Sequence, residues 1–310
     1  MPKALTPDPA VPFDRLLLRR RRDRAAAELG AHDFLIREAA ERLADRLDDV
    51  RRKFPMALDL GCHGGQIAGI LAGRGGIERL VQCDLSPAMA RRAAANGFAS
   101  LAADEEFLPF AKESFDLVLS CLDLHWVNDL PGALLQIRHA LKPDGLFLAV
   151  LFGAGTLGEL RECLIEAEVE VKGGASPRIS PFADTRDGAG LLQRAGFALP
   201  VADAETVTVT YGDALGLMRD LGGMGESNAT RARSDRFAGR ELFGRAAALY
   251  AERHREKEGR IAARFRLLFL TGWAPAGSQQ QPLRPGSARG RLADALGTVE
   301  RKAGERARPT

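Results

Sequence analysis

The chain has 310 residues, of which 45% are hydrophobic and 27% are charged. This composition excludes a wholly disordered, collagen-like or coiled-coil protein, and the length suits one large domain or two small ones. The formal net charge is +3, from 44 basic and 41 acidic residues. That charge is too near balance to predict nucleic acid as the main partner.

The four cysteines, Cys62, Cys83, Cys121 and Cys163, lie far apart. Because they form no C-x-x-C pair, we expect no zinc knuckle and no redox dithiol, and buried cysteines of this kind fit a reducing compartment. The first 25 residues contain no apolar segment of the secretory type. The longest apolar run, Leu146–Phe152, is strand-sized rather than membrane-sized. The prediction is a cytoplasmic protein without a metal site.

The N-terminal region predicts a helix. Residues 1–12 are rich in proline, whereas Leu16–Leu47 carries apolar side chains at helical spacing. Arg19–Arg22 is a run of arginines inside this helix, for which we expect a solvated face, with docking to an acidic partner or an anionic membrane as the alternative. Residues 1–52 are therefore expected to form an N-terminal helical extension.

Strands and helices alternate over the next hundred or so residues. The expected strands are Pro55–Leu60, Leu80–Asp84, Phe98–Ala102, Phe115–Cys121 and Leu146–Phe152, and the expected helices are Gln66–Ala72, Ser86–Asn96 with Ser86 as N-cap, and Leu130–Leu141. Lys142–Gly145 predicts a turn. The strands are continuous apolar runs, which is typical of a parallel sheet covered by helices on both faces.

Two later segments predict the strands that complete the sheet. Glu205–Tyr211 and Arg264–Trp273 fit an antiparallel pair. The long segments 153–186 and 212–263 follow strands, where extra length usually builds a lid or a substrate wall. We therefore predict one α/β domain over 53–273, with a seven-stranded, mostly parallel sheet, helices on both faces and helical lid insertions. Residues 274–310 predict a disordered basic tail with a short helix near Arg291–Leu296.

A glycine-rich turn follows the first strand. Ligands bind at the carboxyl ends of strands in an open parallel sheet, and glycines let the backbone approach them closely. Counted from Gly61, the dinucleotide fingerprint G-x-G-x-x-G needs glycine where the sequence has His63 and Gln66, so it fails. The pattern acid-x-Gly-x-Gly-x-Gly fits better, with Asp59, Gly61 and Gly65 in place and His63 replacing one glycine.

Acidic residues follow the second and third strands. Asp84, which precedes Leu85, ends the second strand and can accept both hydroxyls of a ribose. Asp104 and Glu105 follow the third strand, where an adenine amino group needs an acceptor; a solvated turn is the alternative for these two. Together with the glycine turn, the acids predict a Rossmann-like class I methyltransferase fold that binds S-adenosylmethionine.

Five stretches resemble a known family: Ala103–Phe110, Leu124–Pro131, Leu141–Gly145, Gly173–Phe182 and Asp220–Asn228. They are similar to the complex I assembly factors of mitochondria and their bacterial relatives, and the last two lie outside the general cofactor motif. The resemblance implies a role in building respiratory NADH dehydrogenase, a subunit of that complex as protein substrate, hydroxylation of an arginine, and peripheral contact with the inner membrane or its complexes. A more distant resemblance is to the malonyl-carrier O-methyltransferase of biotin synthesis.

Three functional hypotheses follow from these resemblances. The first is an enzyme that modifies a protein arginine during assembly of complex I. The second is an S-adenosylmethionine-dependent O-methyltransferase that esterifies a carrier-bound carboxylic acid. The third is a non-catalytic assembly chaperone that keeps the fold only for binding.

His63 departs from the family pattern, which has glycine there, and we expect it to weaken cofactor binding without abolishing it.

Residues after the fourth strand and in the insertions are the candidates for chemistry. His125 is a candidate general base or substrate ligand and Trp126 a pocket wall, with structural packing as the alternative for both. Glu226 and Asn228 are candidates for contact with an arginine side chain, in a loop that otherwise needs glycine for flexibility. Arg178 is a candidate carboxylate clamp or a lid residue. At i and i+2 of the expected helix, His254 and Glu256 point apart, so they predict no iron site.

Overall fold

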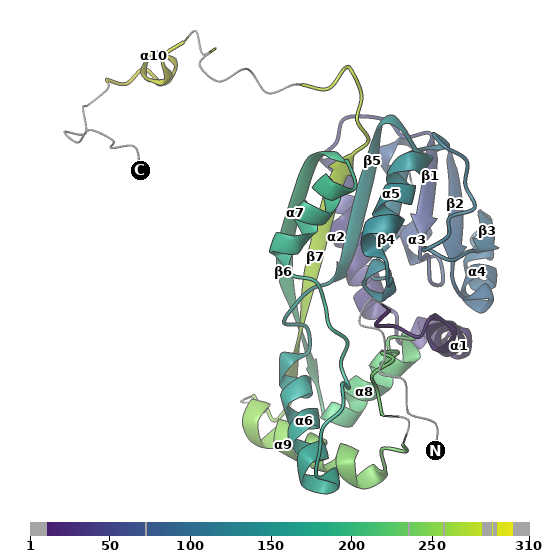
Figure 1. Ribbon diagram of the computed structural model, residues 1–310, viewed down its shortest axis with the longest axis vertical. Coiled ribbons are helices and arrows are strands. Elements are labelled where there is room, and N and C mark those ends of the chain that lie inside the picture. The colour runs from purple at the N-terminus through teal and green to yellow at the C-terminus, as the bar shows by residue number, and fades with distance from the viewer. Residues whose placement is uncertain are drawn as a thin grey trace. The chain divides into compact units, whose positions relative to one another are not determined.

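The structure is a computed structural model that describes residues 11–299 apart from 72, 235, 257, 281–286, 288 and 289. The chain divides into two compact units, Met1–Ala276 and Gly277–Thr310. In the first unit, helices cover both faces of a seven-stranded sheet, and α6, α8 and α9 gather at one end of it (Figure 1). Within the described residues, no helix is both long enough and apolar enough to cross a bilayer.

The elements follow the predicted alternation of strands and helices. The strands are β1 (Met56–Leu60), β2 (Arg79–Asp84), β3 (Ala99–Ala102), β4 (Phe115–Cys121), β5 (Leu141–Phe152), β6 (Ala198–Tyr211) and β7 (Ile261–Trp273). The helices are α1 (Arg15–Ala25), α2 (Phe34–Asp48), α3 (Gln66–Leu71), α4 (Pro87–Ala94), α5 (Leu130–Ala140), α6 (Gly158–Lys172), α7 (Thr185–Arg194), α8 (Ala214–Gly223), α9 (Arg240–His254) and α10 (Leu292–Leu296). The short helix expected in the tail is thus α10, and much of the rest of that tail lies outside the described residues.

The strand order is β3-β2-β1-β4-β5-β7-β6. The first five strands pair in parallel, and β7 runs antiparallel to both β5 and β6. The predicted fold class and the predicted antiparallel pair are therefore confirmed. The order reverses between β1 and β4, which is where an open parallel sheet forms its ligand crevice.

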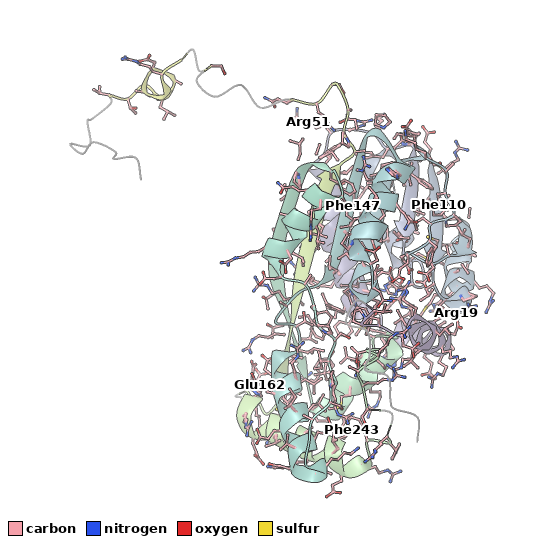
Figure 2. The ribbon with its side chains drawn as sticks, in the orientation of Figure 1. Arg19, Arg51, Phe110, Phe147, Glu162 and Phe243 are labelled. Atoms are coloured by element: carbon pink, nitrogen blue, oxygen red, sulfur yellow. The ribbon has the colours of Figure 1, made fainter. Side chains whose placement is uncertain are left out.

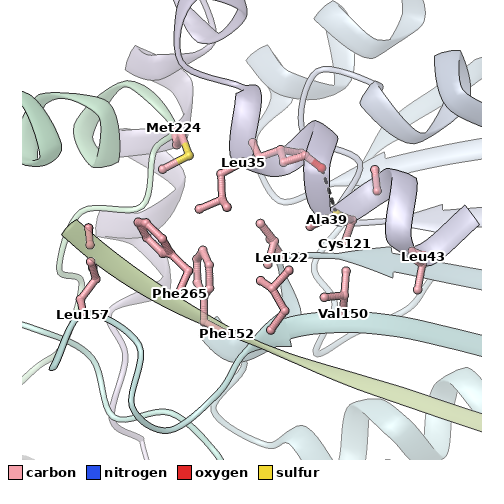
Figure 3. Packing of buried hydrophobic residues seen from close by; sticks show 14 of the residues in the cluster. Leu35, Ala39, Leu43, Cys121, Leu122, Val150, Phe152, Leu157, Met224 and Phe265 are labelled. Carbon is pink, nitrogen blue, oxygen red and sulfur yellow. Dashed lines mark hydrogen bonds between the residues drawn. The ribbon is translucent and has the colours of Figure 1, made fainter. Parts of the chain in front are cut away.

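Alternate residues of the central strands enter two apolar layers. Leu117 and Leu119 face the layer that contains α2 and α3, whereas Val118 faces the layer that contains α5 and α7. Side chains on both faces of β4 are therefore buried, which explains why its sequence is a continuous apolar run. Figure 3 shows α2 packed over the end of β4, where Cys121 Sγ lies 3.6 Å from the carbonyl oxygen of Ile36.

The helices α6, α8 and α9, which we call the lid helices after the predicted insertions, belong to the first of these layers. Leu160 of α6, Leu217 of α8 and Leu249 of α9 are buried in the same cluster as the α2 side chains. Figure 3 shows the junction, where Phe265 and Phe152 of the sheet meet Leu157 and Met224 of the lid. The lid is consequently held to the sheet by a continuous apolar core, and substantial burial would be lost if it swung away.

Two local predictions are wrong. The expected continuous helix over Leu16–Leu47 is broken between α1 and α2, with a single 3-10 turn at Leu29–Ala31. Gly30 lowers the helix propensity there, and Leu29 is buried in the main core. The turn expected at Lys142–Gly145 lies inside β5, where the register with β4 shifts and Asp144 has a φ of 63°. It forms an irregularity of the strand rather than a separate loop.

Candidate cofactor and substrate site

The glycine turn after β1 has the conformation that its sequence predicts. Gly61 and Gly65 have φ values of 72° and 83°, and His63 has a φ of 47°, so it tolerates the left-handed region as expected. A Cβ on Gly61 would lie 2.1 Å from Cγ of Asp123, and one on Gly65 would lie 2.3 Å from Nδ2 of Asn96. Both glycines are therefore required by close approach as well as by backbone conformation.

Asp84 and the turn belong to a buried cluster of acidic side chains at the carboxyl ends of β1, β2 and β4, where an open parallel sheet binds its ligands. We call this cluster the acidic crevice. The Asp84 carboxylate accepts hydrogen bonds from the backbone N–H of His63 at 3.0 Å and of Ser86 at 2.7 Å. Asp59 and Asp123 are also fully buried beside it (each 0% exposed). The His63 ring donates from Nε2 to the carbonyl oxygen of residue 121 at 2.9 Å, so it is a fixed part of the crevice rather than a mobile side chain.

Arg22 of α1 is buried in the same crevice (0% exposed). Its guanidinium donates to Asp123 at 2.5 Å and lies 3.7 Å from both Asp84 and Glu226. Burial lowers the pKa of Arg22, but the charges of these carboxylates raise it above its ordinary value. The solvated face predicted for Arg19–Arg22 is therefore wrong for Arg22, because buried carboxylates offer a guanidinium better partners than water does.

Arg15 lies two helical turns before Arg22 on the same face of α1, and it reaches the two acids that follow β3. It donates to Asp104 at 2.7 Å and also to Glu105, which is fully buried (0% exposed). Asp104 itself is only half-buried. The alternative of a purely solvated turn is therefore wrong for Glu105, whose carboxylate is part of the crevice wall.

The crevice holds more carboxyl groups than cations among the described residues. The acids are Asp59, Asp84, Glu105, Asp123 and Glu226, against the guanidinium groups of Arg15 and Arg22. Burial, together with the Asp84 and Asp123 charges, raises the pKa of Asp59 to about 8. Burial and the charge of Asp123 raise the pKa of Glu105 to about 7. A site with this surplus is stabilised by an additional cationic, hydrogen-bonding ligand.

S-adenosylmethionine fits the donor and acceptor set of this crevice. Its sulfonium and ammonium are cations, and its ribose hydroxyls and adenine amino group are hydrogen-bond donors. Oδ2 of Asp123 and Oε1 of Glu105 are buried and have no hydrogen-bond partner among the described residues. Unpaired buried acceptors of this kind are costly unless a ligand supplies a donor.

His125, Trp126 and Glu226 meet at the boundary between the crevice and the lid. Oε2 of Glu226 accepts hydrogen bonds from His125 Nε2 at 2.9 Å and from Trp126 Nε1 at 2.7 Å. Burial favours the protonated form of Glu226, but the interactions with His125 and Arg22 outweigh it and lower its pKa. The structure thus brings together three predicted site residues from two distant segments. Glu226 holds a negative charge at a dry position.

A cavity of about 460 Å³ opens beside Glu226 under the lid. Its walls are mainly apolar, and they include Phe152, Leu160, Leu164, Phe182, Met218 and Phe243. Figure 2 shows Phe243 among the lid helices. We call this cavity the lid pocket; its chemistry suits an aliphatic or aromatic chain that ends in a group able to bind the carboxylate of Glu226.

Arg178 and Asn228 contribute to the structure of the lid. Arg178 Nε donates to Glu168 at 3.0 Å, and Arg178 lines the lid pocket. This position agrees with the prediction of Arg178 as a lid residue. Asn228 donates to the carbonyl oxygen of Pro177 at 2.8 Å and accepts from the backbone N–H of Phe13 at 2.8 Å. A substrate contact for either residue stays a prediction.

The charged end of α9 lies apart from the crevice. His254 is the last residue of α9, and its ring lies 5.2 Å from the ring of Tyr250. In the part of the chain that the structure describes, no group of three or more His, Cys, Asp or Glu side chains is arranged to hold a metal ion.

Three residues of the site escaped the sequence analysis, namely Asp123, Arg15 and Arg22. Asp123 stands two residues before His125, directly after the fourth strand, and its position at that strand end was the available signal. The two arginines carried no such signal, since a run of arginines on a helix is usually solvated.

Leu85, which follows Asp84 in the predicted cofactor site, packs beside Phe13, Leu18 and Trp126 rather than in the main core.

Comparison with known proteins first defines the class. Residues 58–149 match the family model of a methyltransferase domain. The YcgJ protein of Bacillus subtilis superposes with a TM-score of 0.54 at 15% identity, covering 76% of this chain and 98% of that chain. The sheet order, the glycine turn and this match make the chain a member of the class I S-adenosylmethionine-dependent methyltransferase superfamily.

Sequence relatives then define the family. The protein named arginine-hydroxylase NDUFAF5, mitochondrial, of Danio rerio is 44% identical over 286 residues, which cover 91% of this chain and 88% of the relative. The malonyl-[acyl-carrier protein] O-methyltransferase of Laribacter hongkongensis is 34% identical over 286 residues, which cover 88% of this chain and 94% of the relative. The chain belongs to the NDUFAF5 family, and its resemblance to both groups is confirmed.

Proposed function

We propose that the chain binds S-adenosylmethionine in the acidic crevice and modifies an arginine side chain of a respiratory NADH dehydrogenase subunit while that complex is assembled. The relatives named arginine-hydroxylase support the target side chain. These relatives are also named mitochondrial, which supports a role at the membrane that carries the respiratory chain. In this proposal the protein acts from the cytoplasmic side, in peripheral contact with that membrane.

The chain's own residues supply binding, orientation and exclusion of water. Asp84 would accept from the ribose, and Asp104 and Glu105 from the adenine amino group. Asp123 would add negative charge beside the sulfonium, and that cation would in turn favour the ionised form of Asp59. When bound, the cofactor supplies an activated methyl group attached to a cationic sulfur. Burial of all these carboxylates except Asp104 keeps their fields strong because little water screens them.

Glu226 carries the assignment of an arginine substrate. Its Oε1 has no hydrogen-bond partner among the described residues, lies 3.7 Å from Arg22 and lines the lid pocket. The apolar walls suit the methylene stem of an arginine, and a charged carboxylate at the inner end suits its guanidinium. His125 and Trp126 fix the carboxylate by two hydrogen bonds, so its orientation is set before the substrate enters.

The carrier-bound acid remains the second candidate because of the arginines of the lid pocket. Arg21, Arg178, Arg233 and Arg236 all line it, and a carboxylate or phosphate on the substrate would pair with such side chains. Arg178 is paired with Glu168, and Arg233 lies 3.6 Å from Asp14, which reduces the charge available to an anion. The arginine substrate is therefore favoured.

The test is mass spectrometry of NADH dehydrogenase subunits from a strain that lacks the gene, complemented with the wild type, with Glu226→Gln or with Glu162→Gln. Glu162 is exposed on the lid helix α6 and serves as the matched control. We expect one arginine to carry an added oxygen or methyl group in the wild type and in Glu162→Gln only. A label transferred from S-adenosylmethionine to a small ester instead would select the carrier-bound acid. Normal complex assembly with no modification anywhere would select the chaperone.

A further inference from the structure

Two arginines of α1 project from one face of that helix into the cofactor crevice. Arg15 and Arg22 are seven residues apart, which is two helical turns, so their side chains lie on the same side. Leu18 lies on that face between them and is fully buried (0% exposed). By contrast, Arg19 and Arg20 are exposed to solvent, and Figure 2 labels Arg19 at the outer surface of α1.

These two guanidinium groups form ion pairs with the carboxylates that we expect to bind the cofactor. Arg22 lies against Asp84, the expected ribose ligand, and Arg15 binds Asp104 and Glu105, the expected acceptors for adenine. Arg22 is completely enclosed, so its side chain fills the space beside Asp84 rather than bordering it. The cofactor and the two arginines therefore compete for the same positions.

The attachment of α1 differs from that of the lid. At its N-terminal end, α1 is held by a small apolar cluster of its own, formed by Phe13, Leu18, Trp126 and Ala229. Only its last residue, Ala25, joins the main core. The segment between α1 and α2 is a short 3-10 turn rather than continuous helix. The polar contacts of α1 near the crevice include the ion pairs of Arg15 and Arg22 and the carboxylate of Asp23, which accepts from the Ser86 hydroxyl at 2.6 Å and from the backbone N–H of residue 88 at 3.2 Å. A cationic ligand can exchange with the ion pairs.

The residue next to Arg22 faces the other site. Arg21 donates to the carbonyl oxygen of Asn228 and lines the lid pocket. Consecutive residues on a helix point about 100° apart, so a single helix carries one arginine to the crevice and the next to the lid. Any displacement of α1 that withdraws Arg22 from Asp84 must also move Arg21 in the wall of the lid pocket.

We propose that α1 is an intramolecular ligand of the crevice: Arg15 and Arg22 hold its carboxylates until S-adenosylmethionine displaces them, and the same displacement reshapes the lid pocket for substrate. This inference rests on the proposed cofactor. It makes cofactor binding the first step and substrate binding the second, because the wall at Arg21 moves only after the crevice is filled.

The first test is hydrogen exchange of the full-length wild type with and without saturating S-adenosylhomocysteine. We expect amides of residues 15–25 to exchange about tenfold faster in the presence of the ligand, whereas amides of β4 and β5 become more protected. If exchange of residues 15–25 slows instead, α1 closes on the cofactor rather than leaving it, and the inference is overturned. This measurement needs no variant.

The second test is calorimetric titration of S-adenosylhomocysteine into wild type, Arg22→Ala and Arg20→Ala. Removal of the competing guanidinium should tighten binding by about tenfold in Arg22→Ala, and the exposed Arg20 control should leave the affinity unchanged. Weaker binding by Arg22→Ala, in a variant with wild-type circular dichroism, would overturn the inference. Failure of every form to bind the ligand would overturn the cofactor assignment and this inference together, whereas binding by Arg22→Ala alone supports both.

Discussion

The crevice and the lid pocket share a boundary at Glu226, but their walls are chemically opposite. Carboxyl groups line the crevice, and the chain's own arginines compensate part of their charge. The lid pocket is lined mainly by side chains that continue the apolar core. A change in the crevice should therefore act through charge and hydrogen bonding, whereas a change in the lid pocket should act through fit, with Glu226 taking part in both.

The two regions also differ in how firmly their covers are held. The lid helices share one buried cluster with the sheet, so the walls that they give to the lid pocket are fixed by packing, whereas Arg21 of α1 is not part of that cluster. The cover of the crevice, α1, is held by a small apolar cluster of its own, by hydrogen bonds of Asp23 and by ion pairs that a ligand can replace. The comparison predicts that cofactor binding alters α1 more than it alters the lid.

The largest expected effect is on the crevice. Asp84→Ala removes the expected ribose acceptor and leaves the backbone N–H groups of His63 and Ser86 without their carboxylate. We expect affinity for S-adenosylhomocysteine to fall about 100-fold, measured by calorimetry. Asp187→Asn, on the exposed surface of α7, is the control and should bind normally. An unchanged affinity in Asp84→Ala would move the cofactor out of the crevice.

The second prediction concerns the shared boundary. Glu226→Gln keeps the shape of the side chain but removes the charge next to His125 and Trp126. We expect modification of the protein substrate to fall about 30-fold, which is the loss of one buried charge-assisted hydrogen bond. The affinity of Glu226→Gln for S-adenosylhomocysteine should differ from that of the wild type by less than about threefold. A larger loss of cofactor affinity than of modification would show that Glu226 belongs to the crevice alone.

The third prediction uses pH to test the surplus of carboxyl groups. The pKa of Asp59 is raised from its ordinary 3.8 to about 8, so between these values the native state holds a proton that the unfolded state has released. Stability contributed by Asp59 therefore falls as pH rises. Relative to Asp59→Asn, the free energy of unfolding of the wild type should fall by about 1.4 kcal/mol per pH unit between about pH 5 and 7. Urea unfolding at three pH values measures the slope.

The sign of that slope is the decisive observation. Suppose instead that the free energy of unfolding of the wild type, relative to that of Asp59→Asn, is independent of pH or rises with pH. The Asp59 carboxyl is then ionised in the native state, and a cation other than those described here must lie beside it. Saturating S-adenosylhomocysteine supplies such a cation only through its ammonium, so it should reduce the slope without removing it.

The smallest expected effect is at His63. Its ring is buried in the crevice and hydrogen-bonded to the backbone of β4, at a position where the family pattern has glycine. His63→Gly puts glycine at a backbone position with a positive φ, where a side chain is disfavoured, and opens space at the turn. We expect affinity for S-adenosylhomocysteine to rise about threefold in calorimetry. Equal affinities would show that the ring does not crowd the cofactor.

Most of the fold could be predicted from the sequence because its signals are local. Continuous apolar runs such as Phe115–Cys121 predict buried parallel strands, and Ser86 followed by Pro87 predicts a helix start, where Ser86 does cap α4. The glycines at Gly61 and Gly65 and the acid at Asp84 also follow from spacing, since the ends of parallel strands meet at one edge. Family motifs in the lid identified Glu226, but not its bonds to His125 and Trp126.

The sequence by itself determined the succession of strands and helices along the chain, the glycine turn and the acids at the strand ends. Each of these depends on residues that are neighbours in the chain or in a regular repeat. Only the tertiary structure decided the environment of the arginines on α1. Arg20 and Arg22 are indistinguishable by pattern, yet one is exposed and the other is enclosed by carboxylates from three separate segments. The free energy that buries a charge comes from such distant partners, and no local pattern contains them.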